Sequence, residues 1–303
     1  MLVASVSESL KVWGCLEDDF RLKSTWETPK EDFRCSFWNH TNQVIAIGGV
    51  HRKIYLVTNG GQLLSSLPFS NQEFIMGPIN SVCFSNNSRY LGAGAGKNVH
   101  IWDLKKKELH TLLQGHRGDL SAVRYFSDGH IASGDDVGSL KLWNISAGSS
   151  SVDLVPVESR SPITCLEASH HRSIDRIACG YHDGGICVWD PATQTQTRHQ
   201  VLHTGPLSAL SFSPKNPRLL ATGGADGRLT LLDITSRSDR DPNATVPVGD
   251  NISALCFHED AIHTLVGTVS GYILLFDWRN IKRPVCKVPA HVPFPVNALS
   301  FQV

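Results

Sequence analysis

The chain has 303 residues, of which 41% are hydrophobic, and its 28 lysine and arginine residues balance its 28 aspartate and glutamate residues. A chain of this length and composition can bury a sizeable core, in one large domain or two small ones, which argues against a disordered protein. The zero net charge also argues against a generally basic nucleic-acid binder.

Targeting and membrane segments are not apparent in the sequence. Residues 1–6 lack the basic and continuous apolar regions of a secretory signal peptide. No stretch approaches the roughly 18 unbroken apolar residues of a membrane-spanning helix. The eight cysteines lie far apart, mostly within apolar runs and never as C-x-x-C, which is typical of buried free thiols in a reducing compartment. We therefore expect a cytosolic or nuclear protein with no membrane partner.

A short segment of alternating apolar and polar residues recurs along the chain and ends in tryptophan or an equivalent hydrophobic residue. Its seven copies are LKVWG (10–14), IYLVT (54–58), VHIWD (99–103), LKLWN (140–144), ICVWD (186–190), LTLLD (229–233) and ILLFD (273–277). Their terminal hydrophobic residues are separated by 44, 45, 41, 46, 43 and 44 residues. Such alternation indicates strands, and a nearly constant period of this length indicates a repeat architecture.

Further predicted strands precede these segments. A second strand lies directly before the segment, as at 131–136, 177–184 and 220–227, and the intervening Gly and Asp residues supply hairpin turns. More apolar strands lie upstream, and we expect them to be the innermost strands; they are residues 79–85, 120–126, 163–169, 207–213 and 252–258. No capped helical pattern occurs, so the sequence predicts an almost entirely β protein.

Several of these segments resemble WD repeats. Gly115-His116 is followed by Trp143-Asn144, and Trp102-Asp103 and Trp189-Asp190 close their own units. The resemblance implies an all-β, seven-bladed propeller with four strands per blade, as one domain over residues 1–303. The chain opens on a second strand, whereas residues 296–301 form a solitary first strand. We therefore expect the C-terminal strand to complete the N-terminal blade and to remove an open sheet edge.

The resemblance also implies a buried hydrogen-bond network of His, Ser or Thr, Asp and Trp in each blade. The residues at these positions are His116, Ser133 and Trp143 in blade four, Asp183 and Trp189 in blade five, and His203, Thr222 and Asp226 in blade six. Val137 takes the Asp position of blade four, Cys179 the hydroxyl position of blade five and Leu232 the Trp position of blade six. We predict that no blade carries the full set and that blades one, two, three and seven keep less. Because these residues recur at equivalent positions, we interpret them as structural and predict no catalytic residue.

Two segments imitate chemical motifs. LGAGAGKN (91–98) lacks the first Gly, the Ser or Thr after Lys and the following helix of a phosphate-binding loop. HEDAIH (258–263) has one residue too many for the helical H-E-x-x-H zinc motif and falls at a predicted turn. An enzyme that uses the central channel would need an acid-base pair there, whereas the inner strands supply mainly Ser, Asn and Thr. We therefore predict no cofactor, no metal site and no enzymatic activity.

Three groups of segments resemble the family of γ-tubulin ring complex targeting adaptors, that of neural precursor cell expressed, developmentally down-regulated protein one. They are FWNHTN before VIA (37–46), SRYL before VHIWDL (88–104) and DWR before RPV (277–285). The resemblance implies a non-enzymatic scaffold whose propeller targets the γ-tubulin ring complex to the centrosome and to spindle microtubules, through centrosomal or augmin-like proteins. In that family a helical C-terminal segment holds the complex, so we expect residues 1–303 to be the N-terminal part of a longer cytoplasmic, cytoskeletal protein.

We expect protein partners to dock across loops of several blades. The turns between second and third strands supply the candidate residues His51, Arg52, Lys97, Asp136, His182 and Arg228. Basic loops at 51–53, 105–107 and 237–240 lack the interleaved aromatic residues of a nucleic-acid site. The simplest interpretation is solvated loop charge, and the alternative is that these separated loops act together on an acidic, tubulin-like protein surface. In an alternative, residues 276–279 (FDWR) resemble the W-D-x-R signature of substrate receptors for cullin-based ubiquitin ligases, which makes Arg279 the candidate contact.

Overall fold

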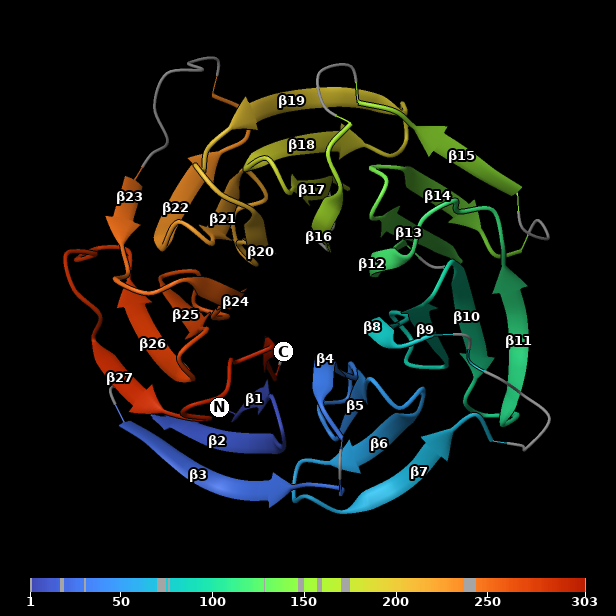
Figure 1. Ribbon diagram of the computed structural model, residues 1–303, viewed down its shortest axis with the longest axis horizontal. Coiled ribbons are helices and arrows are strands. Elements are labelled where there is room, and N and C mark those ends of the chain that lie inside the picture. The colour runs from blue at the N-terminus through green and yellow to red at the C-terminus, as the bar shows by residue number, and fades with distance from the viewer. Residues whose placement is uncertain are drawn as a thin grey trace.

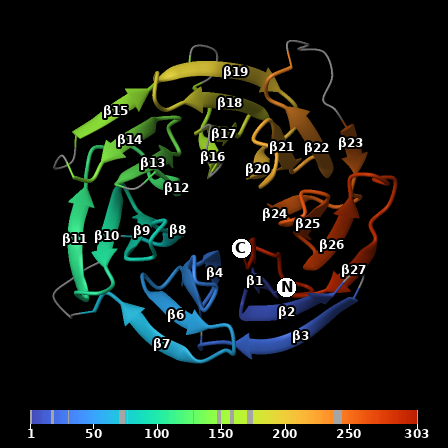
Figure 2. The same ribbon diagram turned by 180° about the vertical axis from the view of Figure 1, so that it is seen from behind.

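The chain folds into a ring of seven four-stranded antiparallel sheets (Figure 1; Figure 2 shows the ring from behind). The computed structural model describes residues 2–16, 19–29, 31–69, 75, 77–127, 129–146, 150–156, 160–169, 175–236 and 244–302. This arrangement confirms the predicted all-β, seven-bladed propeller. The strands predicted to be innermost, such as Ile163–Ala168 and Leu207–Phe212, do stand nearest the axis of the ring.

Each blade runs from its innermost to its outermost strand. Blade one contains β28 (Ala298–Phe301), β1 (Leu2–Val6), β2 (Leu10–Leu16) and β3 (Asp19–Trp26), and blade two contains β4 (Phe33–Trp38), β5 (Val44–Gly49), β6 (Ile54–Thr58) and β7 (Leu63–Leu67). Blade three contains β8 (Ile79–Phe84), β9 (Tyr90–Ala95), β10 (Asn98–Asp103) and β11 (Glu108–Leu113); blade four contains β12 (Leu120–Ser127), β13 (His130–Asp135), β14 (Leu140–Asn144) and β15 (Ser150–Leu154); and blade five contains β16 (Ile163–Ala168), β17 (Ile177–Tyr181), β18 (Gly185–Asp190) and β19 (Thr195–Val201). Blade six contains β20 (Leu207–Phe212), β21 (Leu219–Gly224), β22 (Arg228–Asp233) and β23 (Ala244–Pro247), and blade seven contains β24 (Ile252–Phe257), β25 (His263–Thr268), β26 (Tyr272–Asp277) and β27 (Cys286–Pro289).

The two ends of the chain close the ring in blade one. Strand β28 pairs antiparallel with β1, with Val3 opposite Phe301 and Val6 opposite Ala298. Figure 1 shows both termini at this blade, the C-terminus nearer the axis of the ring. The predicted closure is therefore confirmed, and it gives β1 a hydrogen-bonded neighbour on its inner side.

Neighbouring blades are joined around the axis by side chains on the first strands or directly before them. Each of five residues donates a hydrogen bond to a backbone carbonyl of the next blade: Asn80 to Leu120 (2.8 Å), Thr164 to Leu207, Ser208 to Ile252 (2.5 Å), Ser253 to Val296 (2.7 Å) and Asn297 to Phe33 (2.7 Å). The Ser, Asn and Thr residues that the sequence places in the inner strands thus satisfy backbone carbonyls at the blade boundaries.

Glycines on the second strands let successive blades approach closely. A Cβ atom on Gly134 would lie 2.7 Å from the side chain of Ile163, and one on Gly223 would lie 2.6 Å from that of Ile252. Both isoleucines belong to the first strand of the following blade and are almost fully buried. The same contact recurs from blade to blade, so the spacing of the blades depends on these small residues.

All eight cysteines are free thiols, five of them buried and three half-buried. Burial raises the pKa of Cys35 and of Cys83 to about 12, so neither thiol ionises near neutral pH.

The part of the chain that the structure describes contains no helix with the length and hydropathy of a membrane span.

Candidate partner-binding faces

The strand order gives the propeller two faces that carry different turns. Because successive strands of a blade are antiparallel, the turn between second and third strands lies at the end where the chain enters the first strand. Backbone hydrogen bonds connect these segments, from Asp136 N to Asp119 O (3.0 Å) and from His182 N to Pro162 O (2.9 Å). We call this end the upper face, and the end with the first-to-second and third-to-fourth strand turns the lower face.

The six candidate residues in the turns between second and third strands all lie on the upper face and are exposed; they are His51, Arg52, Lys97, Asp136, His182 and Arg228. They come from five consecutive blades, two to six. Asp136 also fastens its own loop, since its Oδ1 accepts a hydrogen bond from Asp119 N at 2.9 Å. The structure therefore brings the predicted set to one surface, on which Asp136 has a structural contact.

The upper face also presents apolar side chains that the sequence analysis did not single out. Val137, Val269, Val292 and Phe294 are 54%, 46%, 48% and 52% exposed, respectively. Val292 and Phe294 lie in the segment that crosses from blade seven to β28. A Cβ atom on Gly271 would lie 2.5 Å from Phe294 O, so this segment packs closely on blade seven. The sequence does mark this exposed segment, because AHVPFPV (290–296) places apolar residues between prolines outside any repeat strand.

Blade four contains a complete buried network. Nε1 of Trp143 donates to Ser133 Oγ at 2.8 Å, Ser133 Oγ lies 2.6 Å from His116 Nε2, and His116 Nδ1 lies 2.8 Å from Asp135 Oδ2. Burial opposes the ionisation of Asp135, but hydrogen bonds from His116 and from the backbone outweigh it and lower its pKa. The ionised carboxylate accepts the Nδ1 proton, so Ser133 donates to Nε2. The predictions that Val137 holds the Asp position and that no blade is complete are wrong.

Blade six shows why the prediction placed the Asp position of blade four at Val137 instead of Asp135. There His203 Nε2 lies 2.8 Å from Thr222 Oγ1 and His203 Nδ1 lies 2.9 Å from Asp226 Oδ1. Gly224 occupies the position that corresponds to Asp135, two residues after the hydroxyl, and its missing side chain leaves room for Asp226. The carboxylate therefore reaches the same place from two different positions in the sequence, which counting residues could not detect.

Blade one has more of the hydrogen-bond network than predicted, and blade five has less. In blade one, Ser5 Oγ accepts from Trp13 Nε1 at 2.9 Å and lies 2.9 Å from His291 Nε2, while His291 Nδ1 lies 3.1 Å from Glu8 Oε2. The imidazole comes from the other end of the chain, and it lies in blade one because the ring closes there.

In blade five, Trp189 Nε1 is buried without a hydrogen-bond partner, so Trp189 and Asp183 do not form the predicted network.

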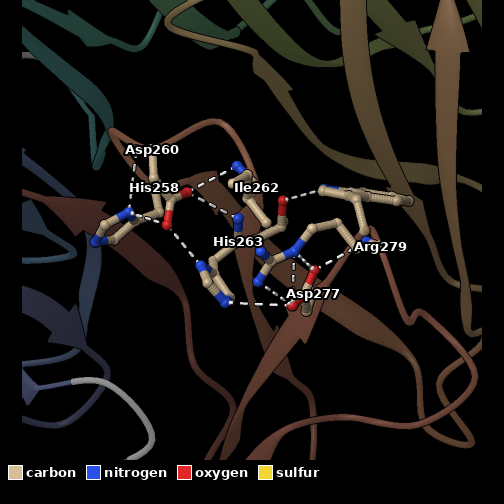
Figure 3. A network of polar contacts seen from close by, with 8 residues as sticks. His258, Asp260, Ile262, His263, Asp277 and Arg279 are labelled. Carbon is tan, nitrogen blue, oxygen red and sulfur yellow. Dashed lines mark hydrogen bonds and ion pairs between the residues drawn. The ribbon is translucent and has the colours of Figure 1, made fainter.

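Arg279 lies on the lower face, opposite the other candidates. Its guanidinium binds both carboxylate oxygens of Asp277, with Nη2 2.7 Å from Oδ2 and Nε 3.0 Å from Oδ1 (Figure 3). The basic loop at 105–107 also follows a third strand and so lies on this face, whereas the loop at 51–53 lies on the upper face. These two loops cannot meet one flat partner surface together, and residues 237–240 lie outside the described residues.

The channel opens on the lower face in a cavity of about 800 Å³. Phe37, Phe126, Phe257 and Phe301 contribute to its lining. One ion pair crosses between inner strands here, with Arg124 Nε 3.0 Å from Glu167 Oε2. Arg124 also donates to Ser81 Oγ at 3.1 Å, so its donors are engaged in joining blades three, four and five. No local sequence motif marks this pair, whose members lie 43 residues apart on neighbouring inner strands.

Comparison with known proteins agrees with this geometry. The family described as WD domain, G-beta repeat matches residues 71–103, 106–144, 155–190 and 194–233. Protein NEDD1 is 29% identical in Homo sapiens and 31% identical in Mus musculus, in each case over 73% of this chain and 33% of the relative. Protein tipD of Dictyostelium discoideum is 24% identical over 86% of this chain and 42% of the relative. The chain thus spans between a third and just over two fifths of the length of these relatives.

Proposed function

The chain belongs to the WD40-repeat β-propellers, which serve as protein-interaction scaffolds, and from this premise we propose that it is the targeting module of a γ-tubulin ring complex adaptor. In this proposal the propeller has no enzymatic activity and binds centrosomal or spindle-microtubule proteins. It thereby brings the γ-tubulin ring complex to the centrosome and the mitotic spindle for microtubule nucleation.

The upper face carries this proposal. Exposed cationic residues of blades two, three and six lie on the same face as the exposed side chains of Val292 and Phe294. Protein-binding surfaces usually combine apolar and charged side chains in this way. The similarity to NEDD1 in two mammals supports the choice of partner, because the resemblance of segments 37–46, 88–104 and 277–285 is to that adaptor family.

The test is affinity purification of the chain from mitotic cell extract, followed by mass spectrometry. The decisive variant is V292S/F294S, which removes two exposed apolar side chains from the upper face. The matched control is L63S/L64S, which removes two apolar side chains of comparable exposure, 46% and 54%, from the outermost strand of blade two. We expect the upper-face variant to lose centrosomal and spindle-microtubule proteins and the control to retain them.

A second variant, Arg279→Ala, distinguishes the alternative on the lower face. Recovery of a cullin and its adaptor by the wild-type chain, with loss in R279A, would contradict the proposal and support a ubiquitin-ligase substrate receptor. Equal recovery of spindle proteins by V292S/F294S and the wild type would show that the upper face is not the binding surface.

A further inference from the structure

Two imidazoles and one carboxylate converge at the turn between β24 and β25 on the lower face (Figure 3). Asp260 Oδ2 lies 3.0 Å from His258 Nδ1 and 2.5 Å from His263 Nδ1. The three side chains are 21%, 29% and 24% exposed in chain order, so water reaches them. Among the described residues this is the only group of three His, Cys, Asp or Glu side chains whose ligand atoms all lie within 4.8 Å of one another.

The turn itself does not require the two histidines. Its backbone hydrogen bonds run from His258 N to His263 O (2.9 Å) and from Ala261 N to His258 O (2.9 Å). Blade three forms the same turn, with Ser85 N bonded to Tyr90 O at 2.9 Å. Ser85 and Tyr90 therefore stand where blade seven has its two imidazoles. Asp260 also supports the turn, because its Oδ1 accepts from the backbone N–H groups of Ile262 and His263 at 2.7 and 2.9 Å.

The contacts place a ring nitrogen and a carboxylate oxygen close together between the side chains. His263 Nδ1–H donates to Asp260 Oδ2, whereas His258 Nδ1 accepts the backbone N–H of Asp260 at 3.1 Å. The lone pair of His258 Nδ1 is thus directed to the backbone N–H of Asp260, and Asp260 Oδ2 lies 3.0 Å from the same nitrogen. Two electron-rich atoms at this distance need a positive charge beside them, which is either a proton on the imidazole or a bound cation.

A carboxylate stands behind one of the imidazoles. His263 Nε2 lies 3.8 Å from Asp277 Oδ2, and Asp277 is itself fixed by Arg279 (Figure 3). A carboxylate beside the non-coordinating nitrogen orients an imidazole and increases its basicity at metal sites. His258 is held differently, since its ring packs edge-on against Phe301 with the ring centroids 4.9 Å apart.

We propose that His258, Asp260 and His263 bind one divalent transition-metal ion, with zinc as the best match, and that water or a partner side chain supplies the fourth ligand. Two imidazoles and one carboxylate suit zinc, whose bonds to these ligands are about 2.0–2.2 Å long. Binding through Nδ1 requires the proton of His263 to move to Nε2, beside Asp277, and opens the carboxylate contacts by a small side-chain rotation. This site differs from the helical H-E-x-x-H zinc motif, because a short turn rather than helical periodicity brings its ligands together.

Isothermal titration with zinc chloride at neutral pH tests the site. We expect one zinc ion per chain. The variant H258S/H263Y carries the residues of the blade-three turn, so it keeps the backbone bonds and Asp260 while it removes both imidazoles. It should bind zinc at least about tenfold more weakly. The control H51S/H182S removes two exposed histidines from the upper face and should bind zinc as the wild type does.

Two results would overturn the proposal. One is equal zinc affinity of H258S/H263Y and the wild type when circular dichroism shows both to be folded. The other is the absence of stoichiometric uptake by the wild type, which would assign the positive charge to a proton. Repeating the titration at about pH 5.5 should weaken binding, because protons compete with zinc for the imidazole nitrogens.

Discussion

Replacing Ser133 with alanine tests whether the blade-four network stabilises the propeller. The hydroxyl accepts from Trp143 Nε1 at 2.8 Å and donates to His116 Nε2 at 2.6 Å, and all three residues are buried. The alanine variant leaves one donor and one acceptor buried without partners. Each such group costs about 1–3 kcal/mol, so we expect the free energy of unfolding to fall by about 2–6 kcal/mol. This is a large part of the roughly 5–15 kcal/mol typical of a folded domain.

Urea unfolding followed by circular dichroism measures the loss of stability, as a lower midpoint with an unchanged dependence on urea concentration. The control is Ser270→Ala, in an exposed turn of blade seven, where surface substitutions usually change stability by less than about 0.5 kcal/mol. A loss of less than about 1 kcal/mol for S133A would refute the reasoning, because it would mean that water or rearranged side chains satisfy both buried groups.

Three further predictions concern other blades. Cys179→Ser should raise the melting temperature, because the new hydroxyl would accept from the unpartnered Trp189 Nε1 in blade five and offset an unsatisfied-group cost of about 1–3 kcal/mol. Burial lowers the pKa of His291 below 6.5, so the unfolded state binds the proton more strongly than the folded state does. The free energy of unfolding, measured with urea, should therefore fall as the pH drops below about 6.5. His291→Asn should abolish this dependence. The hydrogen bond from Arg89 lowers the pKa of Asp103 to about 2, so its contribution, present above about pH 4, should disappear between pH 4 and 2 in an acid titration of stability, and Arg89→Ala should remove that step.

The fold follows from information that is local in the sequence. The alternation in segments such as 140–144 and 186–190 defines strands, because each strand buries one face against its neighbours. Their nearly constant spacing defines the blade, and the solitary strand at the C-terminus, beside a chain that opens on a second strand, predicts the closure between β28 and β1. These signals do not depend on where distant side chains lie.

The sites depended on contacts that the spacing cannot specify. Asp135 rather than Val137 completes the blade-four network, because a strand end and a turn can deliver a carboxylate to the same place. His291 reaches Ser5 from the opposite end of the chain, and ring closure alone creates that contact. Arg279 was separated from the other candidates only when strand direction assigned it to the lower face.

The sequence by itself determined the seven β-rich repeats, and its resemblance to WD repeats implied their four strands and the way the ring closes. Only the tertiary structure decided which side chains meet, including the apolar pair Val292 and Phe294 on the upper face and the His258 and His263 imidazoles around Asp260. The physical reason is that burial patterns repeat along the chain with a fixed period, whereas a binding surface or a metal site requires atoms to lie within a few ångströms of one another. Turn geometry, strand direction and ring closure set those distances together.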